Sequence, residues 1–150
     1  MRDTDLIIKA FEVMSEAHDG QVDKGGNPYL FHPISVALKA CAEKFNSKVF
    51  ATALLHDVVE DTEVTFDALV EYGFPSEVLD ALKLLIHDKS VPYMEYVKSL
   101  SVNLIARTVK MADLENNMDL SRIKNVSDRD CERVFKKYIP AYVFLKNLSF

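Results

Sequence analysis

An adjacent histidine and aspartate, His56 and Asp57, lie in the most hydrophobic stretch of the 150-residue chain. A carboxylate inside an apolar helix is unfavourable unless it is paired, protonated or bound to a metal ion. Glu60 and Asp61 follow within about one helical turn, so four polar groups would gather at the end of one buried element. From this segment alone, a metal or catalytic site and a buried histidine–aspartate hydrogen bond at a helix end explain the sequence equally well.

Further candidate ligands come from two distant segments. His32 precedes Pro33 at the entrance of a predicted helix, and Asp113 lies at the margin of an apolar helical stripe. Asn117 follows Asp113 by four residues, so both side chains can point into one cavity. Taken alone, each segment is better explained by a structural or solvated role. Taken together, two histidines and two aspartates are a typical mixed nitrogen and oxygen ligand set for a divalent first-row metal.

The order of these residues resembles the HD phosphohydrolase superfamily. The surrounding residues resemble more narrowly the hydrolase domain of the RelA/SpoT group, whose members degrade the alarmones ppGpp and pppGpp. The resemblance is strongest over residues 6–120. Its matching segments are Ala17-His18-Asp19-Gly20-Gln21, Lys24-Gly25-Gly26-Asn27-Pro28-Tyr29, His32-Pro33, Leu55-His56-Asp57-Val58-Val59-Glu60-Asp61-Thr62, and Val109-Lys110-Met111-Ala112-Asp113 with Asn117.

This resemblance implies a metal-dependent hydrolase that converts (p)ppGpp to GDP or GTP and pyrophosphate with a metal-activated water. The implied cofactor is Mn²⁺, with another divalent transition metal as an alternative. The implied metal ligands are His32, His56, Asp57 and Asp113. The implied catalytic pair, which orients or deprotonates the water, is Glu60 and Asp61, and the implied substrate-binding residues are Lys24, Asn117 and Tyr29. A solvated loop lysine and a buried structural tyrosine are the alternative interpretations of Lys24 and Tyr29.

Three departures from the family pattern concern the nucleotide rather than the metal. Asp23 replaces an arginine that helps to hold the guanine base. Two arginines that usually follow the metal aspartate are missing from residues 114–119, and residues 86–89 differ from those that help to form the nucleotide pocket. The alternatives are therefore a phosphohydrolase of another nucleotide and a nucleotide-binding HD module without turnover. We expect structural roles for His18 and His87.

The elements that must position these residues are predicted to be helices. Apolar residues recur at helical spacing, no period-2 alternation predicts a strand, and glycine and proline are scarce. The predicted fold is all-α, one HD-type helical bundle of about seven to nine helices over residues 1–150. The predicted helices span residues 4–18, 33–44, 47–59, 65–73, 75–87, 91–100, 103–118 and 128–146, the last interrupted at Pro140. The helix over 47–59 is apolar nearly all round and is expected to be central and buried.

Composition restricts the partners. A net charge of −5 without a basic run argues against a nucleic-acid polymer as ligand. A small nucleotide substrate is compatible, because a bound divalent cation can reverse the local field. Two separated cysteines, a polar N-terminus and the lack of a long apolar run predict a cytoplasmic location without a membrane partner. The sequence leaves the oligomeric state open.

Overall fold

The computed structural model describes residues 1–148, so the last two residues of the expected 1–150 domain lie outside it. Within this range the chain is helical apart from its loops and an isolated bridge between Val22 and Pro28, which confirms the all-α prediction. The helices are α1 (Asp3–Ala17), α2 (Phe31–Ala40), α3 (Ser47–Leu55), α4 (Val58–Asp61), α5 (Phe66–Glu71), α6 (Ser76–Leu85), α7 (Tyr93–Leu100), α8 (Leu104–Asn117), the 3₁₀ turn η1 (Leu120–Arg122), α9 (Asp128–Arg133), the π-helical turn η2 (Val134–Tyr138) and α10 (Ile139–Lys146).

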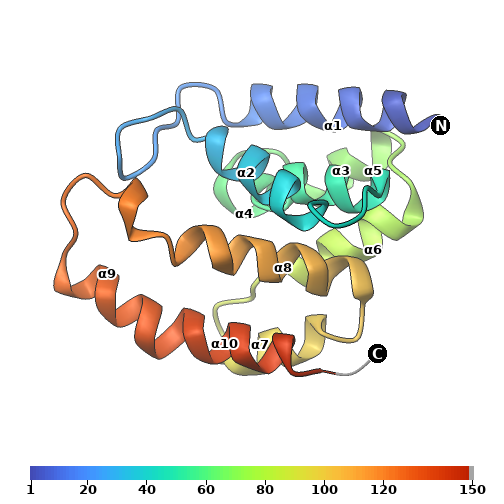
Figure 1. The fold of residues 1–150 in the computed structure, drawn as a ribbon. Coiled ribbons are helices and arrows are strands. Elements are labelled where there is room, and N and C mark those ends of the chain that lie inside the picture. The colour runs from blue at the N-terminus through green and yellow to red at the C-terminus, as the bar shows by residue number, and fades with distance from the viewer. Residues whose placement is uncertain (149–150) are drawn as a thin grey trace.

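Helix α3 is the centre of the fold, as its composition predicts. It packs against α1, α2, α6 and α8, and seven of its nine residues are buried. Figure 1 shows α1 along one side of the molecule and the run from α9 to α10 along the opposite side, with α2, α3 and α8 between them. The start of α1 and the end of α10 lie at one end of this bundle, and the loop before α2 meets the turn after α8 at the other end. None of the helices in the described part of the chain is long and apolar enough to cross a membrane.

The predicted helix over 47–59 is divided at the His-Asp pair. Helix α3 ends at Leu55, His56 and Asp57 form a turn, and α4 begins at Val58. The turn is stabilised because Nδ1 of His56 donates a hydrogen bond to the carbonyl oxygen of Ala53 at 2.6 Å, which satisfies a carbonyl at the end of α3. The pair therefore lies at the C-terminal end of a buried helix rather than inside it.

The last predicted helix is continuous but irregular. Residues 128–146 run from α9 through the π turn η2 into α10, without the interruption expected at Pro140. Proline has no N–H to donate to the carbonyl four residues earlier, and the wider π turn directly before it accommodates this defect. Figure 1 shows the resulting single rod, which covers α8.

The loop between α1 and α2 is shaped by Asp23 and two glycines. Oδ1 of Asp23 accepts hydrogen bonds from the backbone N–H groups of Gly25 at 2.8 Å and Asn27 at 3.0 Å. Gly26 has φ +80°, and a Cβ on Gly25 would lie 2.5 Å from the carbonyl oxygen of Arg122. The loop can therefore pack directly on η1 only because Gly25 has no side chain.

Candidate metal centre

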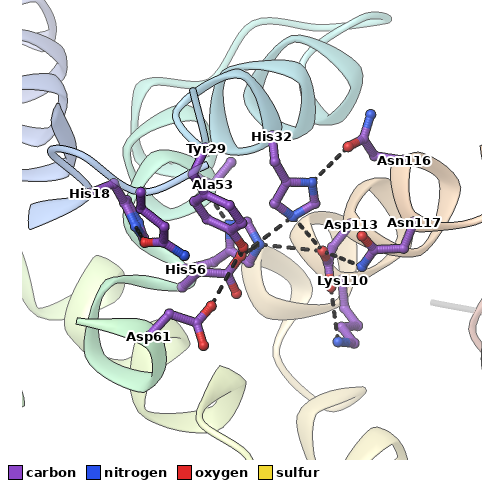
Figure 2. A network of polar contacts seen from close by, with 12 residues as sticks. His18, Tyr29, His32, Ala53, His56, Asp61, Lys110, Asp113, Asn116 and Asn117 are labelled. Atoms are coloured by element: carbon purple, nitrogen blue, oxygen red, sulfur yellow. Dashed lines mark hydrogen bonds and ion pairs between the residues drawn. The ribbon is translucent and has the colours of Figure 1, made fainter. Parts of the chain in front are cut away.

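The four residues predicted as metal ligands come together although they lie on three separate segments. His32 is on α2, His56 and Asp57 form the turn after α3, and Asp113 is on α8. One potential ligand atom from each of the four lies within 4.8 Å of the others. Figure 2 shows the side chains of His32, His56 and Asp113 pointing toward one another. The histidines and Asp113 are buried, whereas the side chain of Asp57 is 19% exposed.

The distances within this cluster fit a shared ion. Nε2 of His32 lies 3.0 Å from Asp113 Oδ1 and 3.4 Å from Asp57 Oδ2. Nε2 of His56 lies 3.0 Å from Asp57 Oδ2 and 3.3 Å from Asp113 Oδ1, yet this buried nitrogen has no hydrogen-bond partner. Ligand atoms about 2.1 Å from one ion lie roughly 3.0–3.4 Å apart in octahedral or tetrahedral geometry. The donor set and its spacing could therefore hold one divalent metal ion.

Hydrogen bonds orient both imidazole rings for this role. Nδ1 of His32 donates to Oδ1 of Asn116 at 2.6 Å, and Nδ1 of His56 donates to the carbonyl oxygen of Ala53 at 2.6 Å. These bonds keep a proton on Nδ1 and direct Nε2 of each ring toward the cluster, where it can bind a metal ion once it has lost its own proton. Sequence analysis did not identify Asn116, which is 4% exposed and meets His32 only where α2 packs on α8.

The carboxylate of Asp113 is held at both oxygens. Oδ2 accepts a hydrogen bond from Nζ of Lys110 at 2.9 Å, and Oδ1 accepts one from Nδ2 of Asn117 at 3.0 Å. Burial alone would raise the pKa of Asp113, but Lys110 and the two histidines hold it well below its usual range. Asn117 thus contacts a candidate metal ligand. Lys110 was not assigned a role from sequence, and its spacing of three residues from Asp113 was the available signal.

Charge within the cluster is balanced by protons on the imidazoles. Burial lowers the pKa of His32, but the carboxylates of Asp113 and Asp57 raise it more, to about 9. Burial also opposes ionisation of Asp57, but His56 and His32 hold its pKa below the usual range. A divalent cation can replace these imidazole protons, because metal binding requires neutral imidazole and ionised carboxylate ligands.

Glu60 and Asp61, the predicted catalytic pair, lie on α4 beside the cluster. Oε1 of Glu60 accepts a hydrogen bond from the backbone N–H of His87, so this carboxylate is tied to the loop after α6. Burial and the charges of Asp57 and Glu60 raise the pKa of Asp61. A raised pKa makes a carboxylate a better proton acceptor near neutral pH. The hydroxyl of Tyr29 donates to Asp57 Oδ2 at 2.6 Å and lies 3.5 Å from Asp61 Oδ2.

Two adjoining cavities open beside the cluster. The metal-side cavity, about 210 Å³, is lined by the four candidate ligands, by Glu60 and Asp61, and by lysine and tyrosine side chains. The loop-side cavity, about 260 Å³, lies between the 21–29 loop and residues 120–138. The residues that line both cavities are Tyr29, His32, Asn117 and Tyr138. A ligand with two chemically different ends could occupy both.

Lys24 lines only the loop-side cavity, where it is paired. Its Nζ donates to Oδ1 of Asp130 at 2.7 Å, across 106 residues of sequence. Asp130 also accepts hydrogen bonds from the backbone N–H and hydroxyl of Ser127 at 2.9 Å, in the capping box of α9. The lysine therefore connects the loop before α2 to the start of α9.

The two remaining histidines make structural contacts, in agreement with expectation. Nδ1 of His18 lies 2.8 Å from Gln21 Oε1, and its ring packs on Tyr29 with centroids 4.8 Å apart. Nε2 of His87 donates to the carbonyl oxygen of Val91 at 2.7 Å, and its ring stacks on Tyr96 at 4.5 Å. His18 fastens the loop before α2, and His87 fastens the loop before α7.

The chain is similar in sequence to proteins that are named as hydrolases of guanosine nucleotides. No family model matches the chain. The chain is 36% identical over 129 residues to the guanosine-3′,5′-bis(diphosphate) 3′-pyrophosphohydrolase MESH1 of Danio rerio, covering 79% of this chain and 71% of that protein. It is 32% identical over 149 residues to the guanosine-3′,5′-bis(diphosphate) 3′-pyrophosphohydrolase of Borreliella burgdorferi, covering 89% of this chain and 22% of that protein. It is 31% identical over 121 residues to the bifunctional (p)ppGpp synthase/hydrolase SpoT of Escherichia coli K12, covering 73% of this chain and 17% of that protein.

The chain therefore spans about a fifth of the length of these bacterial relatives. A solved structure, described as a metazoan ortholog of SpoT that hydrolyses ppGpp, matches with a TM-score of 0.77 at 24% sequence identity. The match covers 95% of this chain and 85% of that one, so the two share a fold over nearly their whole lengths.

Proposed function

Because the chain belongs to the guanosine-3′,5′-bis(diphosphate) 3′-pyrophosphohydrolase family, we propose that it hydrolyses ppGpp and pppGpp to GDP or GTP and pyrophosphate. The observation that carries the proposal is the buried cluster of two histidines and two aspartates beside an acidic pair, at the wall of a cavity. A purely structural bundle does not require two imidazole nitrogens and two carboxylates to converge on one point.

We propose Mn²⁺ as the cofactor, held by His32, His56, Asp57 and Asp113. Support comes from the mixed imidazole and carboxylate donor set, which suits divalent first-row metals, and from the hydrogen bonds that fix both rings. When bound, such an ion lowers the pKa of a coordinated water and neutralises charge that develops on phosphoryl oxygens.

The acidic pair would handle the proton of the attacking water. Asp61, whose pKa is raised, is our proposed proton acceptor, and Glu60 holds the loop at His87 that closes one side of the cavity. The hydroxyl of Tyr29 fixes the carboxylate of Asp57 by a 2.6 Å hydrogen bond. These residues thus orient the water and the substrate phosphate relative to one another.

The nucleoside would lie in the loop-side cavity with its phosphates toward the metal-side cavity. Lys24, Asn117 and Tyr29 are our proposed substrate contacts, since all three line the loop-side cavity. A phosphohydrolase of another nucleotide is the second candidate, favoured by one observation. Asp23, which replaces the family's base-holding arginine, accepts hydrogen bonds from its own loop, at Gly25 and Asn27.

We also propose that residues 1–150 act as one domain in the cytoplasm. One hydrophobic cluster joins helices α1 to α8 and α10. The two cysteines, Cys41 and Cys131, are free thiols, as in proteins of reducing compartments.

The test is turnover by the Mn²⁺-loaded protein with ppGpp, GTP, deoxynucleoside triphosphates and a generic phosphodiester, with the Asp57→Ala variant as control. Release of pyrophosphate from ppGpp, lost in the variant, is the expected result. Cleavage of a different nucleotide would support the second candidate and overturn the assigned substrate. Tight metal binding without cleavage of any substrate would instead indicate a nucleotide-binding module without turnover.

A further inference from the structure

The wall of the metal-side cavity also carries basic side chains, Lys89, Lys110 and Lys137. The charge of Lys110 is compensated by its 2.9 Å ion pair with Asp113. Lys137 differs from Lys110 in its surroundings. Its ammonium group contacts aromatic rings, and it forms no ion pair with a carboxylate of residues 1–148. The ammonium group of Lys137, beside the candidate metal ligands, is thus available to a bound ligand.

Aromatic side chains hold the ammonium group of Lys137. Its Nζ lies 4.5 Å from the ring centroid of Tyr93 and 5.9 Å from that of Tyr138. Such contacts favour a cation over the ring face but leave its N–H donors free for an acceptor. Burial and the neighbouring charges of Lys110 and Lys89 lower the pKa of Lys137. Lys89 and Lys110 thus add like charges near Lys137, and an anion bound beside these lysines would reduce the repulsion.

The hydroxyl of Tyr93 provides a second, independent observation. Tyr93 lines the same cavity, and its buried oxygen has no hydrogen-bond partner by geometry. Burial raises the pKa of Tyr93, and the nearby ammonium group of Lys110 opposes this rise. A buried hydroxyl without a partner is unfavourable, so an acceptor is expected there. Lys137 and Tyr93 together present N–H and O–H donors to one space.

The backbone that carries Lys137 is itself unusual. Lys137 and Tyr138 belong to the π turn η2, and both line the metal-side cavity. π-helical turns are rare and often lie at functional sites. Lys136, the preceding residue in this turn, has a side chain that is 76% exposed and lies 3.6 Å from Glu132. Neighbouring lysines on one turn thus have different environments.

We propose that Lys137 and Tyr93 form an anion-binding subsite for the pyrophosphate group that leaves the substrate. The inference rests on the proposed function for the identity of the leaving group. A pyrophosphate bound beside Asp57, Glu60 and Asp61 would need a cation in the same cavity to offset its own charge. Lys24 is engaged with Asp130 in the other cavity. Lys137 is a cation in the metal-side cavity with no carboxylate partner among the described residues.

Binding of inorganic pyrophosphate tests the subsite without turnover. Calorimetric titration would use Mn²⁺-loaded protein at one fixed free Mn²⁺ concentration, so that the ion's own affinity for pyrophosphate is the same throughout. We expect Lys137→Gln to weaken binding about 10-fold, roughly the 1.4 kcal/mol of one charge-assisted hydrogen bond. Tyr93→Phe should weaken it about 3-fold. Lys136→Gln is the matched control and should change nothing, and all variants should keep their Mn²⁺ affinity.

The result distinguishes the subsite from the enzyme activity. The subsite is overturned if the wild type does not bind pyrophosphate, if Lys137→Gln binds it as tightly as the wild type, or if Lys136→Gln loses as much affinity. If ppGpp is not cleaved but Lys137→Gln still loses pyrophosphate affinity, the proposed function fails and the subsite stands. If ppGpp is cleaved and pyrophosphate affinity does not depend on Lys137, the function stands and the subsite fails.

Discussion

At the residue scale, the candidate centre depends as much on the side chains that hold the ligands as on the ligands. His32 is oriented by Asn116, and Asp113 by Lys110 and Asn117. Asp57 is held by the hydroxyl of Tyr29. Such partners restrict each ligand to one rotamer and one protonation pattern, so that the ion meets a preformed site.

Asn116→Ala should lower Mn²⁺ affinity by about 10–100-fold, because the Nδ1 proton of His32 loses its acceptor and the ring is free to turn. Competition with a chelator dye measures this affinity directly. Asn125→Ala, at an exposed loop asparagine, is the control and should bind Mn²⁺ like the wild type. Equal affinity in Asn116→Ala and the wild type would show that the ring needs no support from α8.

The two acidic neighbours are expected to differ in their contributions to rate. Asp61→Asn should reduce kcat by about 10²–10⁴-fold, the range of a lost general base, while Mn²⁺ affinity stays within about twofold. Glu60→Gln should reduce kcat less, since an amide oxygen can still accept the hydrogen bond from the N–H of His87. The rate of steady-state pyrophosphate release by each variant measures these effects on kcat. A larger loss of kcat in Glu60→Gln would indicate that Glu60, not Asp61, is the proton acceptor.

At the element scale, segment ends rather than segment interiors build the centre. The turn between α3 and α4 presents His56 and Asp57, and the 21–29 loop packs on η1 through Gly25. Helix α9 begins at a capping box whose Asp130 also holds Lys24. The irregular π turn η2 brings Lys137 to the same region. The helices supply rigid supports, and their ends supply the polar groups.

Gly25→Ala should displace the loop, because its new Cβ would meet the Arg122 carbonyl oxygen at 2.5 Å, and backbone must shift. We expect a higher KM for the nucleotide and an unchanged Mn²⁺ affinity. Gly20→Ala is the comparison, since it carries backbone strain at φ +77° but has nothing within 4 Å of its Cβ. A rise in KM for Gly20→Ala as large as for Gly25→Ala would mean that strain, not the contact with η1, is responsible.

Asp130→Asn should lower the stability of the protein at neutral pH and reduce its sensitivity to acid. Lys24 and the Ser127 donors hold the pKa of Asp130 below its usual range, so the ionised carboxylate stabilises the folded state. This contribution is present above about pH 4, the usual pKa of an unfolded aspartate, and is lost as pH falls toward the lower folded pKa. Urea unfolding of metal-free protein between pH 3 and pH 7 measures how the free energy of unfolding changes with pH.

The wild type is expected to lose more stability than Asp130→Asn over this interval. Asp128→Asn, on the same helix turn, is a suitable control because it removes a carboxylate at the α9 start without removing the contact with Lys24. If the free energy of unfolding changed with pH in the same way for the wild type and Asp130→Asn, the assigned pairing of Asp130 with Lys24 would be contradicted.

At the scale of the whole molecule, the centre joins α2, the α3–α4 turn and α8, three segments that pack around one core. An ion bound there would connect all three. A ligand that binds only the folded state stabilises it by about 2.7 kcal/mol at 100 times its Kd. The metal site is therefore expected to contribute to folding as well as to catalysis.

Mn²⁺ should raise Tm by several degrees relative to protein in excess chelator, about 2–4 °C per kcal/mol for a chain of this size. Thermal unfolding followed by circular dichroism measures the shift. Asp57→Ala should show little or no Mn²⁺-dependent shift, because it lacks one proposed ligand. An equal shift in this variant would place the stabilising ion elsewhere.

Much of the fold and the ligand set was predictable from sequence because it rests on local patterns. Apolar residues at helical spacing predicted the all-α architecture and the central α3, which the structure confirms. The order of His32, the His56-Asp57 pair and Asp113 predicted the cluster, since these residue types together suit one metal ion. The family resemblance, borne out by the similarity to known hydrolases, connected that cluster to ppGpp.

The tertiary structure alone decided which side chains surround the cluster. Asn116 supports His32 only because α2 packs on α8, and Lys24 meets Asp130 across 106 residues of sequence. Lys137 and Tyr93 approach one cavity from separate elements, through a π turn that helical periodicity does not predict. Local spacing determines which residues share a helix face, whereas contacts between distant segments depend on how the helices pack. The sequence thus determined the candidate ligands, and packing decided their protonation, their partners and the surface offered to a substrate.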